Sequence, residues 1–258
     1  MIQTYNLWDF DCPHETPAMT RYVPAEKKSD WSIVIFPGGA YTHRAVHEGK
    51  GYAEFLNKHG IQAFVVDYRV APSRFPAQLA DARRAVRMVR HHAKEWDACS
   101  DKIAVMGSSA GGHLAALVSN YDRPLPHEGH DAIDREDYKP NAHILCYPVI
   151  SLLSDFGHIG SGEQLLGEQY QELGQALSVQ NLVTAQTPPA FVWHTFADGS
   201  VPVTNSLEYV KALKAANVSA ELHVFPMGGH GLGLADRDPE TAHVAQWSGL
   251  LLNWLRTL

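Results

Sequence analysis

The sequence contains few cysteines, no long apolar run and no excess of positive charge. The cysteines of this 258-residue chain are odd in number and lack CxxC spacing, which favours reduced thiols over a disulfide framework. They are Cys12, Cys99 and Cys146. No stretch of about 18 uninterrupted apolar residues occurs, so we expect no membrane-spanning helix. The formal net charge of −7 argues against a dominant attraction to nucleic acid or to anionic membranes, and favours a small neutral or mixed substrate.

The first residues, MIQTYNLWDFDCPHETP, also lack the basic start and the apolar run of a secretory signal, so we expect a cytoplasmic protein. No internal repeat, low-complexity tract or Gly/Ser-rich linker divides the chain. The 45% of hydrophobic and 19% of charged residues are usual for globular proteins. We therefore expect a single domain over residues 1–258.

Short apolar segments alternate with helical patterns along the chain. Six segments are expected to be strands, and most of them are uniformly apolar, as central strands of a parallel sheet are. They are 31–36, 61–66, 102–107, 142–149, 189–196 and 220–225. Helices are expected at 49–59, 76–96, 109–119, 205–216 and 241–256. This alternation predicts an α/β fold with a mostly parallel central sheet and helices on both of its faces.

The expected helix at 76–96 has an apolar stripe that suits packing on a sheet. Its opposite side carries Arg83, Arg84, Arg87 and Arg90. Because the total charge is acidic, we interpret these arginines as a solvated helix face rather than as a nucleic-acid site.

Two segments do not fit the alternation of strands and helices. Residues 120–141 are polar and acidic, and are expected to form a surface loop. Residues 151–187, called the insert below, fall between two expected strands. We expect the insert to form a small cap over a site at the sheet edge.

A candidate nucleophile lies in VMGSSAGGHLAAL, residues 105–117, between an expected strand and an expected helix. Of its two adjacent serines, only Ser109 is the central serine of a GxSxG pattern. Such a tight turn exposes the serine hydroxyl, and unpaired N–H groups at the helix start can bind a developing oxyanion. The pattern alone is a weak signal, because a glycine-rich turn is its structural alternative.

An acid and a histidine follow at the ends of two later strands. Asp198 comes after the strand at 189–196, and His230 lies in a glycine-rich loop after the strand at 220–225. The chain order Ser, Asp, His is that of α/β-hydrolases. We therefore expect Asp198 to orient His230, and His230 to take the proton of Ser109. A turn at Asp198 and an ordinary loop residue at His230 are the alternatives.

The segment IFPGGAY, residues 35–41, is the candidate oxyanion loop, because its two glycines let backbone N–H groups turn toward a bound carbonyl. The expected donors are the N–H groups of Gly39 or Ala40, together with that of Ala110. A plain β-turn is the alternative interpretation.

Other polar residues are interpreted without a catalytic role. His113, in the helix that follows the candidate nucleophile, is expected to pack or to form hydrogen bonds beneath the site. His127, His130, Asp131 and Asp134 lack a recognised ligand spacing, so a solvated loop is preferred to a metal site.

Many blocks of the chain together resemble one family. They are FPGGAY, DYRVAP, FPAQLADARRAVRMVR, MGSSAGGHLAAL, YPVIS, TPPAFVWHTFAD, VPVTNSLEYVKALKAANVSAELHVF and GGHGLGL. Most of the chain is similar to the small acetyl esterases called acetyl xylan esterases or bifunctional feruloyl and acetyl xylan esterases, α/β-hydrolases related to the hormone-sensitive lipase group. The resemblance implies a serine hydrolase without metal or cofactor that removes short acyl groups from small esters such as acetylated sugars. It implies the same triad, Ser109, Asp198 and His230, and the same oxyanion donors, Gly39, Ala40 and Ala110.

Two departures from the family pattern bear on the site. Ala40 stands where the family usually has a third glycine, which predicts a stiffer oxyanion loop. Ala197 stands where many relatives have the first of two aspartates, which leaves Asp198 as the acid.

Several aromatic residues are candidate contacts for the acyl or sugar group. Tyr41, and Phe156 and Tyr170 of the insert, are placed in this group, with simple packing as the alternative for each. Trp193 and Tyr147 fall inside expected strands and are expected in the core.

Three alternatives to a short-chain esterase stay open. A serine peptidase on the same fold would keep the triad, as would a longer-chain carboxylesterase or lipase. A non-catalytic binding protein would be expected to have lost a triad member. The expected partner is a small-molecule ester, with a homo-oligomer as an alternative to a monomer.

Overall fold

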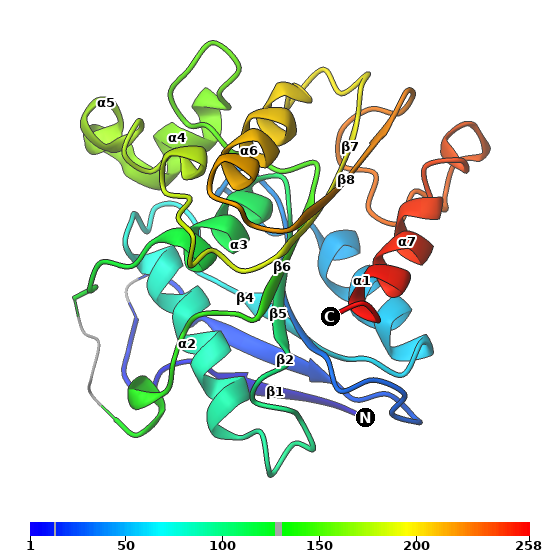
Figure 1. The fold of residues 1–258 in the computed structure, drawn as a ribbon. Coiled ribbons are helices and arrows are strands. Elements are labelled where there is room, and N and C mark those ends of the chain that lie inside the picture. The colour runs from blue at the N-terminus through cyan, green and yellow to red at the C-terminus, as the bar shows by residue number, and fades with distance from the viewer. Residues whose placement is uncertain (13, 127–130) are drawn as a thin grey trace.

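The computed structural model describes residues 1–12, 14–126 and 131–258, which surround a twisted eight-stranded sheet (Figure 1). In chain order the strands are β1 (Ile2–Asn6), β2 (Ala18–Tyr22), β3 (Ser32–Phe36), β4 (Gln62–Asp67), β5 (Ile103–Ser108), β6 (Ala142–Cys146), β7 (Ala190–Thr195) and β8 (Ala220–Phe225). Their order across the sheet is β1-β2-β4-β3-β5-β6-β7-β8. The strands from β3 to β8 are parallel, whereas β2 runs antiparallel to both of its neighbours.

The six parallel strands are those predicted from uniformly apolar segments. All five residues of β3 are buried. Val34 and Phe36 belong to one hydrophobic cluster, and Ile33 and Ile35 belong to the other. Successive side chains of β3 thus enter the cores on opposite faces of the sheet, which explains why four of its five residues are apolar.

Helices cover both faces of the sheet, as predicted. The longer ones are α1 (Val46–Lys58), α2 (Ala77–His91), α3 (Ala110–Asn120), α6 (Thr204–Ala215) and α7 (Gln246–Leu255). Figure 1 shows α1 and α7 on one face, and α2, α3 and α6 on the other. Side chains of α1 and α7 belong to one core cluster, and those of α2, α3 and α6 to the other. This architecture confirms the predicted fold class.

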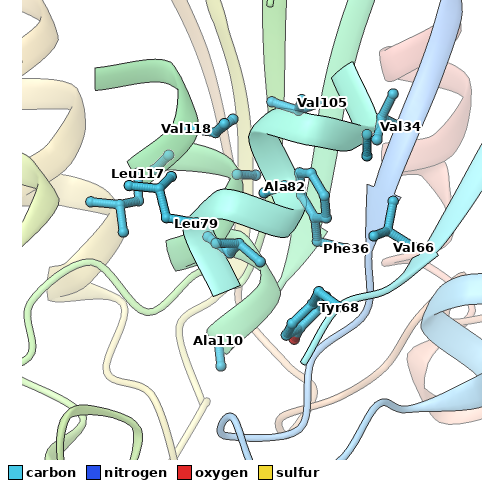
Figure 2. Close-up of a cluster of buried hydrophobic side chains, with 14 of the residues drawn as sticks. Val34, Phe36, Val66, Tyr68, Leu79, Ala82, Val105, Ala110, Leu117 and Val118 are labelled. Carbon is cyan, nitrogen blue, oxygen red and sulfur yellow. The ribbon is translucent and has the colours of Figure 1, made fainter. Parts of the chain in front are cut away.

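The core between α2, α3 and the sheet supports the turn that carries Ser109. Figure 2 shows Leu79 and Ala82 of α2 together with Phe36 and Val105 of the sheet and Leu117 of α3. All of these side chains are fully buried. The packing holds α3 against the ends of β3 and β5.

The antiparallel strands β1 and β2 were not predicted. Most residues of β1 are exposed, and β2 has a single fully buried residue, Met19. A peripheral strand with little buried surface lacks the apolar run by which the central strands are recognised.

The prediction of a solvated arginine face on α2 is wrong. Arg83, Arg84 and Arg87 are only 0%, 4% and 7% exposed. Arg84 binds Asp131 at 2.6 Å and Asp134 at 2.9 Å. The polar segment at 120–141 supplies acceptors for these cations, so its acidic composition complements α2.

The insert contains two short helices, α4 (Ile159–Leu166) and α5 (Tyr170–Leu173), and two 3₁₀ turns, η2 (Gly167–Gln169) and η3 (Val179–Asn181). It lies beside α6 and α3 in Figure 1.

A further 3₁₀ turn is η1 (Ile133–Arg135), and η4 (Pro239–Thr241) precedes α7. Among the helices of the described residues, none combines the length and the apolar composition required to cross a membrane.

Candidate active site

Ser109 occupies the sharp turn between β5 and α3. Its backbone has φ 53° and ψ −121°, a conformation that costs an L-residue about 1–3 kcal/mol. The turn is held because the Ser109 N–H donates to the Cys146 carbonyl at 3.0 Å, and the Ser109 carbonyl accepts from the N–H of Val149 at 2.9 Å. The end of β6 and the segment that follows it therefore hold the serine in the conformation in which its hydroxyl reaches His230.

The glycines of the GxSxG pattern are required by close backbone contacts. A Cβ atom on Gly107 would lie 2.0 Å from the carbonyl oxygen of Gly111, and one on Gly111 would lie 2.0 Å from that of Phe36. Neither approach is tolerable for a carbon atom. The pattern thus reflects how tightly β5, α3 and β3 meet at the turn.

The structure brings the three predicted triad residues into one chain of hydrogen bonds. The Ser109 Oγ lies 2.8 Å from Nε2 of His230, and Nδ1 of His230 lies 2.6 Å from Oδ2 of Asp198. The aspartate side chain has no exposed surface, whereas the histidine side chain is 21% exposed. This geometry suits proton transfer from the serine hydroxyl to an imidazole whose tautomer is fixed by the buried carboxylate.

Asp198 is held by more partners than the sequence indicates. Its Oδ1 accepts the N–H groups of Ser200 and Val201, each at 2.9 Å. Nε2 of the buried His194, on β7, lies 3.3 Å from its Oδ2. Burial by itself raises the pKa of Asp198, but hydrogen bonds from His194, His230 and Val201 outweigh it and lower that pKa below its usual range.

His230 lies in a loop whose conformation depends on glycine. Gly231 and Gly233 have φ of 77° and 59°. The carbonyl of Gly231 accepts from Nε2 of His47 at 2.9 Å, and the N–H of Gly233 donates to the hydroxyl of Tyr147 at 2.9 Å. Backbone contacts on the C-terminal side of His230 thus hold the loop against α1 and against the end of β6.

The candidate oxyanion loop turns through three consecutive residues of positive φ: Gly39 (132°), Ala40 (51°) and Tyr41 (60°). The left-handed conformation costs Ala40 about 1–2 kcal/mol relative to the right-handed one. Within the described residues, the N–H groups of Gly39, Ala40 and Ala110 donate to no protein acceptor. They remain available to a negatively charged oxygen, as an oxyanion hole requires.

The residues predicted to contact the substrate lie in different environments. Tyr41 is fully buried and its hydroxyl lies 2.8 Å from Nδ1 of His113, so its assignment as a substrate contact is wrong. The ring of Tyr41 belongs to the core cluster that also contains Phe36 and Tyr68. His113 lies beneath the site, as predicted. Tyr170 is nearly buried and donates to the carbonyl of Leu152, which agrees with packing.

Phe156 is partly exposed, and its backbone carbonyl accepts from the side-chain amide of Asn205 on α6. The same side chain accepts, through its oxygen, the N–H groups of Ile150 and Ser151. Asn205 therefore fixes the start of the insert, and substrate contact by Phe156 stays a prediction. Trp193 and Tyr147 are buried, as expected.

The loop considered for a metal site holds an ion pair instead. Asp131 and Asp134 bind Arg84, while His127 and His130 lie outside the described residues. In the part of the chain that the structure describes, no group of three or more His, Cys, Asp and Glu side chains is arranged to hold a metal.

Sequence reasoning missed His194 and a second buried polar residue, Glu48 on α1. Each lies within a regular element, and neither belongs to a spaced pattern. Only their burial and their contacts with the site reveal them.

Comparison with known proteins adds a family to this geometry. The family model BD-FAE matches residues 19–213. An acetylxylan esterase of Xylanibacter ruminicola is 34% identical over 247 residues, which cover 93% of this chain and 48% of the relative. Endo-1,4-beta-xylanase B of Butyrivibrio fibrisolvens is 33% identical over 228 residues, which cover 86% of this chain and 35% of the relative. The chain thus spans half the length or less of these curated relatives.

Solved structures are similar over nearly the whole chain. An acetyl ester-xyloside bifunctional hydrolase from Caldicellulosiruptor lactoaceticus is 43% identical, with a TM-score of 0.91 over 99% of this chain and 96% of that one. The carboxylesterase Cest-2923 from Lactobacillus plantarum is 26% identical, with a TM-score of 0.82 over 100% and 97%. These similarities confirm the α/β-hydrolase fold, and the names agree with the predicted enzyme class, a carboxylic ester hydrolase.

Proposed function

Because this chain belongs to the BD-FAE family, we propose that it is a serine carboxylester hydrolase that removes short acyl groups, acetyl above all, from acetylated sugars or oligosaccharides. The substrate class is suggested by relatives named an acetylxylan esterase and an acetyl ester-xyloside bifunctional hydrolase. The reaction class is supported by the chain of hydrogen bonds from Ser109 through His230 to Asp198.

The first half of the reaction transfers the acyl group to the enzyme. Ser109 Oγ attacks the carbonyl carbon of the ester while its proton moves to Nε2 of His230. The resulting tetrahedral oxyanion accepts hydrogen bonds from the N–H groups of Ala110 and of Gly39 or Ala40. The carbon–oxygen bond to the alcohol then breaks, and the alcohol leaves with the proton from His230.

The second half restores the free enzyme. A water molecule attacks the acyl carbon and gives a proton to Nε2 of His230. The second tetrahedral intermediate collapses, the bond to Ser109 Oγ breaks, and the serine takes the proton back as the acid is released. Asp198 remains ionised throughout and stabilises the imidazolium that forms in each half.

One observation carries the proposal: a strained, nearly buried serine hydroxyl lies 2.8 Å from an imidazole whose other nitrogen binds a fully buried carboxylate. A serine is a poor nucleophile unless a positioned base takes its proton. Core packing alone would not require a strained turn that places a serine hydroxyl beside a histidine and a buried carboxylate.

Steady-state hydrolysis of a series of nitrophenyl esters from acetyl to octanoyl tests the proposal. We expect kcat/KM to fall steeply beyond acetyl or propionyl, and Ser109→Ala to lower kcat by about 10⁶-fold, as loss of a nucleophile does in serine hydrolases. Ser119→Ala is the matched control, because Ser119 is also buried and its hydroxyl donates to the carbonyl of Ala115 within α3. A preference for octanoyl esters would contradict the acyl specificity, and full activity of Ser109→Ala would contradict the mechanism.

A further inference from the structure

A buried carboxylate outside the triad connects two loops of the proposed active site. Glu48, in the first turn of α1, is 3% exposed. Its Oε2 accepts the N–H of Gly38 at 2.8 Å, directly before the candidate oxyanion donors. Its Oε1 accepts the hydroxyl of Tyr147 at 2.7 Å. Both oxygens of this carboxylate are therefore used by donors from different parts of the chain.

Tyr147 extends this connection to the loop of His230. Its hydroxyl donates to Glu48 and accepts from the N–H of Gly233 at 2.9 Å. Its ring packs edge-on against the imidazole of His230, with the ring centres 5.1 Å apart. The hydroxyl of Tyr52 lies 3.2 Å from that of Tyr147 and 2.9 Å from Ser108 Oγ, so the network also reaches the end of β5.

The contact between Glu48 and the oxyanion loop is tight. A Cβ atom on Gly38 would lie 2.5 Å from Oε2 of Glu48, 2.8 Å from the carbonyl of Ser108 and 3.0 Å from Cβ of Ser109. Gly38 is thus confined between the carboxylate and the nucleophile turn. A small shift of Glu48 would move the backbone whose next two N–H groups are the proposed oxyanion donors.

The residue before Glu48 strengthens the connection. Nε2 of His47 donates to the carbonyl of Gly231, directly after His230. His47 and Glu48 therefore bind the His230 loop at Gly231 and, through Tyr147, at Gly233.

We propose that Glu48 is a positioning residue for the proposed ester hydrolysis: through Gly38 and Tyr147 it sets the separation between the oxyanion donors and His230. The inference rests on the proposed function. Among the described residues, the hydrogen bonds of Glu48 go to Gly38 and Tyr147 and not to Ser109 or His230, so its loss disturbs the geometry of the transition state without removing a triad residue. Misplacement of reacting groups by about 1 Å costs about 10²-fold in rate.

Two conservative substitutions test the hydrogen bond between Glu48 and Tyr147. In Glu48→Gln, the amide oxygen can still accept from Gly38, but the NH₂ group cannot accept the hydroxyl proton of Tyr147. Tyr147→Phe removes the same hydroxyl while the ring remains. Both variants therefore remove the hydrogen bond that Tyr147 donates to the carboxylate of Glu48, and both preserve the volume of the core.

The experiment measures kcat, KM and the melting temperature for Glu48→Gln, Tyr147→Phe and the double variant on the acetyl ester. We expect each single variant to lower kcat about 10- to 100-fold with KM changed less than about threefold. Because both substitutions break one connection, the double variant should lose no more than about threefold beyond the worse single variant. Unchanged kcat in both single variants, a loss confined to KM, or fully multiplicative losses would overturn the proposal.

Asp81→Asn is the matched control for a merely structural effect. Asp81 is a fully buried carboxylate of α2 that binds Arg69 and the indole N–H of Trp8, and it contacts neither active-site loop. The substitution Asp81→Asn should lower the melting temperature and leave kcat within about twofold of the value for the unaltered protein. An equal fall in kcat for Asp81→Asn and Glu48→Gln would assign the effect to general destabilisation.

Failure of the proposed function has a different signature. It would appear as absent ester turnover in the unaltered protein, or as full turnover in Ser109→Ala. In the absence of turnover, the rate at which a fluorophosphonate modifies Ser109 replaces kcat as the readout, and the same ratios among the Glu48 and Tyr147 variants are expected.

Discussion

At the scale of single residues, the adjacent serines 108 and 109 have opposite environments. Ser108 is the last residue of β5, has no exposed surface and binds the hydroxyl of Tyr52. Ser109 has positive φ and binds His230. The hydroxyl of Ser108 thus binds Tyr52 of α1 in the core, whereas the hydroxyl of Ser109 reaches the imidazole that can take its proton.

Asp198→Asn tests the role assigned to the buried acid. The asparagine amide can donate to Nδ1 of His230, which favours the tautomer that cannot accept the proton of Ser109. We expect kcat to fall about 10³- to 10⁴-fold with little change in KM. Steady-state kinetics on the acetyl ester provide the measurement, and circular dichroism checks the fold. A loss below tenfold would mean that Asp198 does not orient the base.

The sequence predicted the triad residues because each belongs to a pattern with a physical cause. Glycines mark the turn of Ser109 and the loop of His230, and Asp198 follows an apolar strand. Glu48 and His194 have no such pattern, since their roles depend on neighbours distant in the chain. Tyr41 was misassigned because its position beside the oxyanion loop is apparent from the sequence, whereas its burial and its contact with His113 depend on the fold.

At the scale of secondary-structure elements, the close approach of α3 to β3 and β5 supports the nucleophile turn. Gly111→Ala would place a carbon 2.0 Å from the carbonyl of Phe36. We expect it to lower the free energy of unfolding by about 3 kcal/mol, the upper part of the range for overpacking, and to reduce activity by displacing Ser109. Urea denaturation and the acetyl ester assay measure the two effects.

Gly249→Ala is the matched control for that substitution. Gly249 lies in α7, and a Cβ atom there would meet nothing within 4 Å. An alanine in an exposed helix should raise the free energy of unfolding by about 0.5–1 kcal/mol and leave activity unchanged. Equal stability of the Gly111→Ala variant and the unaltered protein would contradict the close packing described at the turn.

Central elements were predicted well and peripheral ones less well. Buried strands such as β3 and β5 have uniformly apolar sequences because helices cover both of their faces. The strand β1 is mostly exposed, so no apolar run marks it. The arginines of α2 were misinterpreted because charge alone does not identify the segment that packs over a helix. Here the described residues of the segment 120–141 supply both a carboxylate, that of Asp134, and backbone carbonyls, those of Tyr121 and Glu136.

At the scale of the whole molecule, buried histidines make stability depend on pH. Burial lowers the pKa of His113 to about 4 and that of His143 to about 3, from an ordinary value of 6.5. Between these values and 6.5 the unfolded chain binds protons that the folded chain excludes. The stabilisation is thus complete above pH 6.5 and is lost as the pH falls toward 4.

We therefore expect the free energy of unfolding, measured with urea, to decrease between pH 7 and pH 4.5 by up to about 1.4 kcal/mol per pH unit for each histidine. His143→Gln should flatten this dependence by about one histidine. The carboxylates with lowered pKa, Asp131 and Asp198, contribute at more acidic pH, because they gain protons only below the ordinary aspartate value of 3.8. A constant free energy between pH 7 and pH 4.5 would contradict neutral burial of both histidines.

The fold brings the proposed catalytic groups together at the carboxyl ends of parallel strands. Ser109 follows β5, Asp198 follows β7, and His230 follows β8. Residues 121 positions apart thereby form the 2.8 Å contact between serine and imidazole. The central claim is that this contact makes Ser109 the nucleophile.

Reaction of the folded protein with a fluorophosphonate, followed by peptide mass analysis, tests that claim most directly. We expect one adduct per chain, located on Ser109, absent from Ser109→Ala and retained in Ser108→Ala. Replacement of the base in His230→Ala should slow the reaction by several orders of magnitude. A folded protein that stays unmodified, or an adduct that persists in Ser109→Ala, would contradict the account.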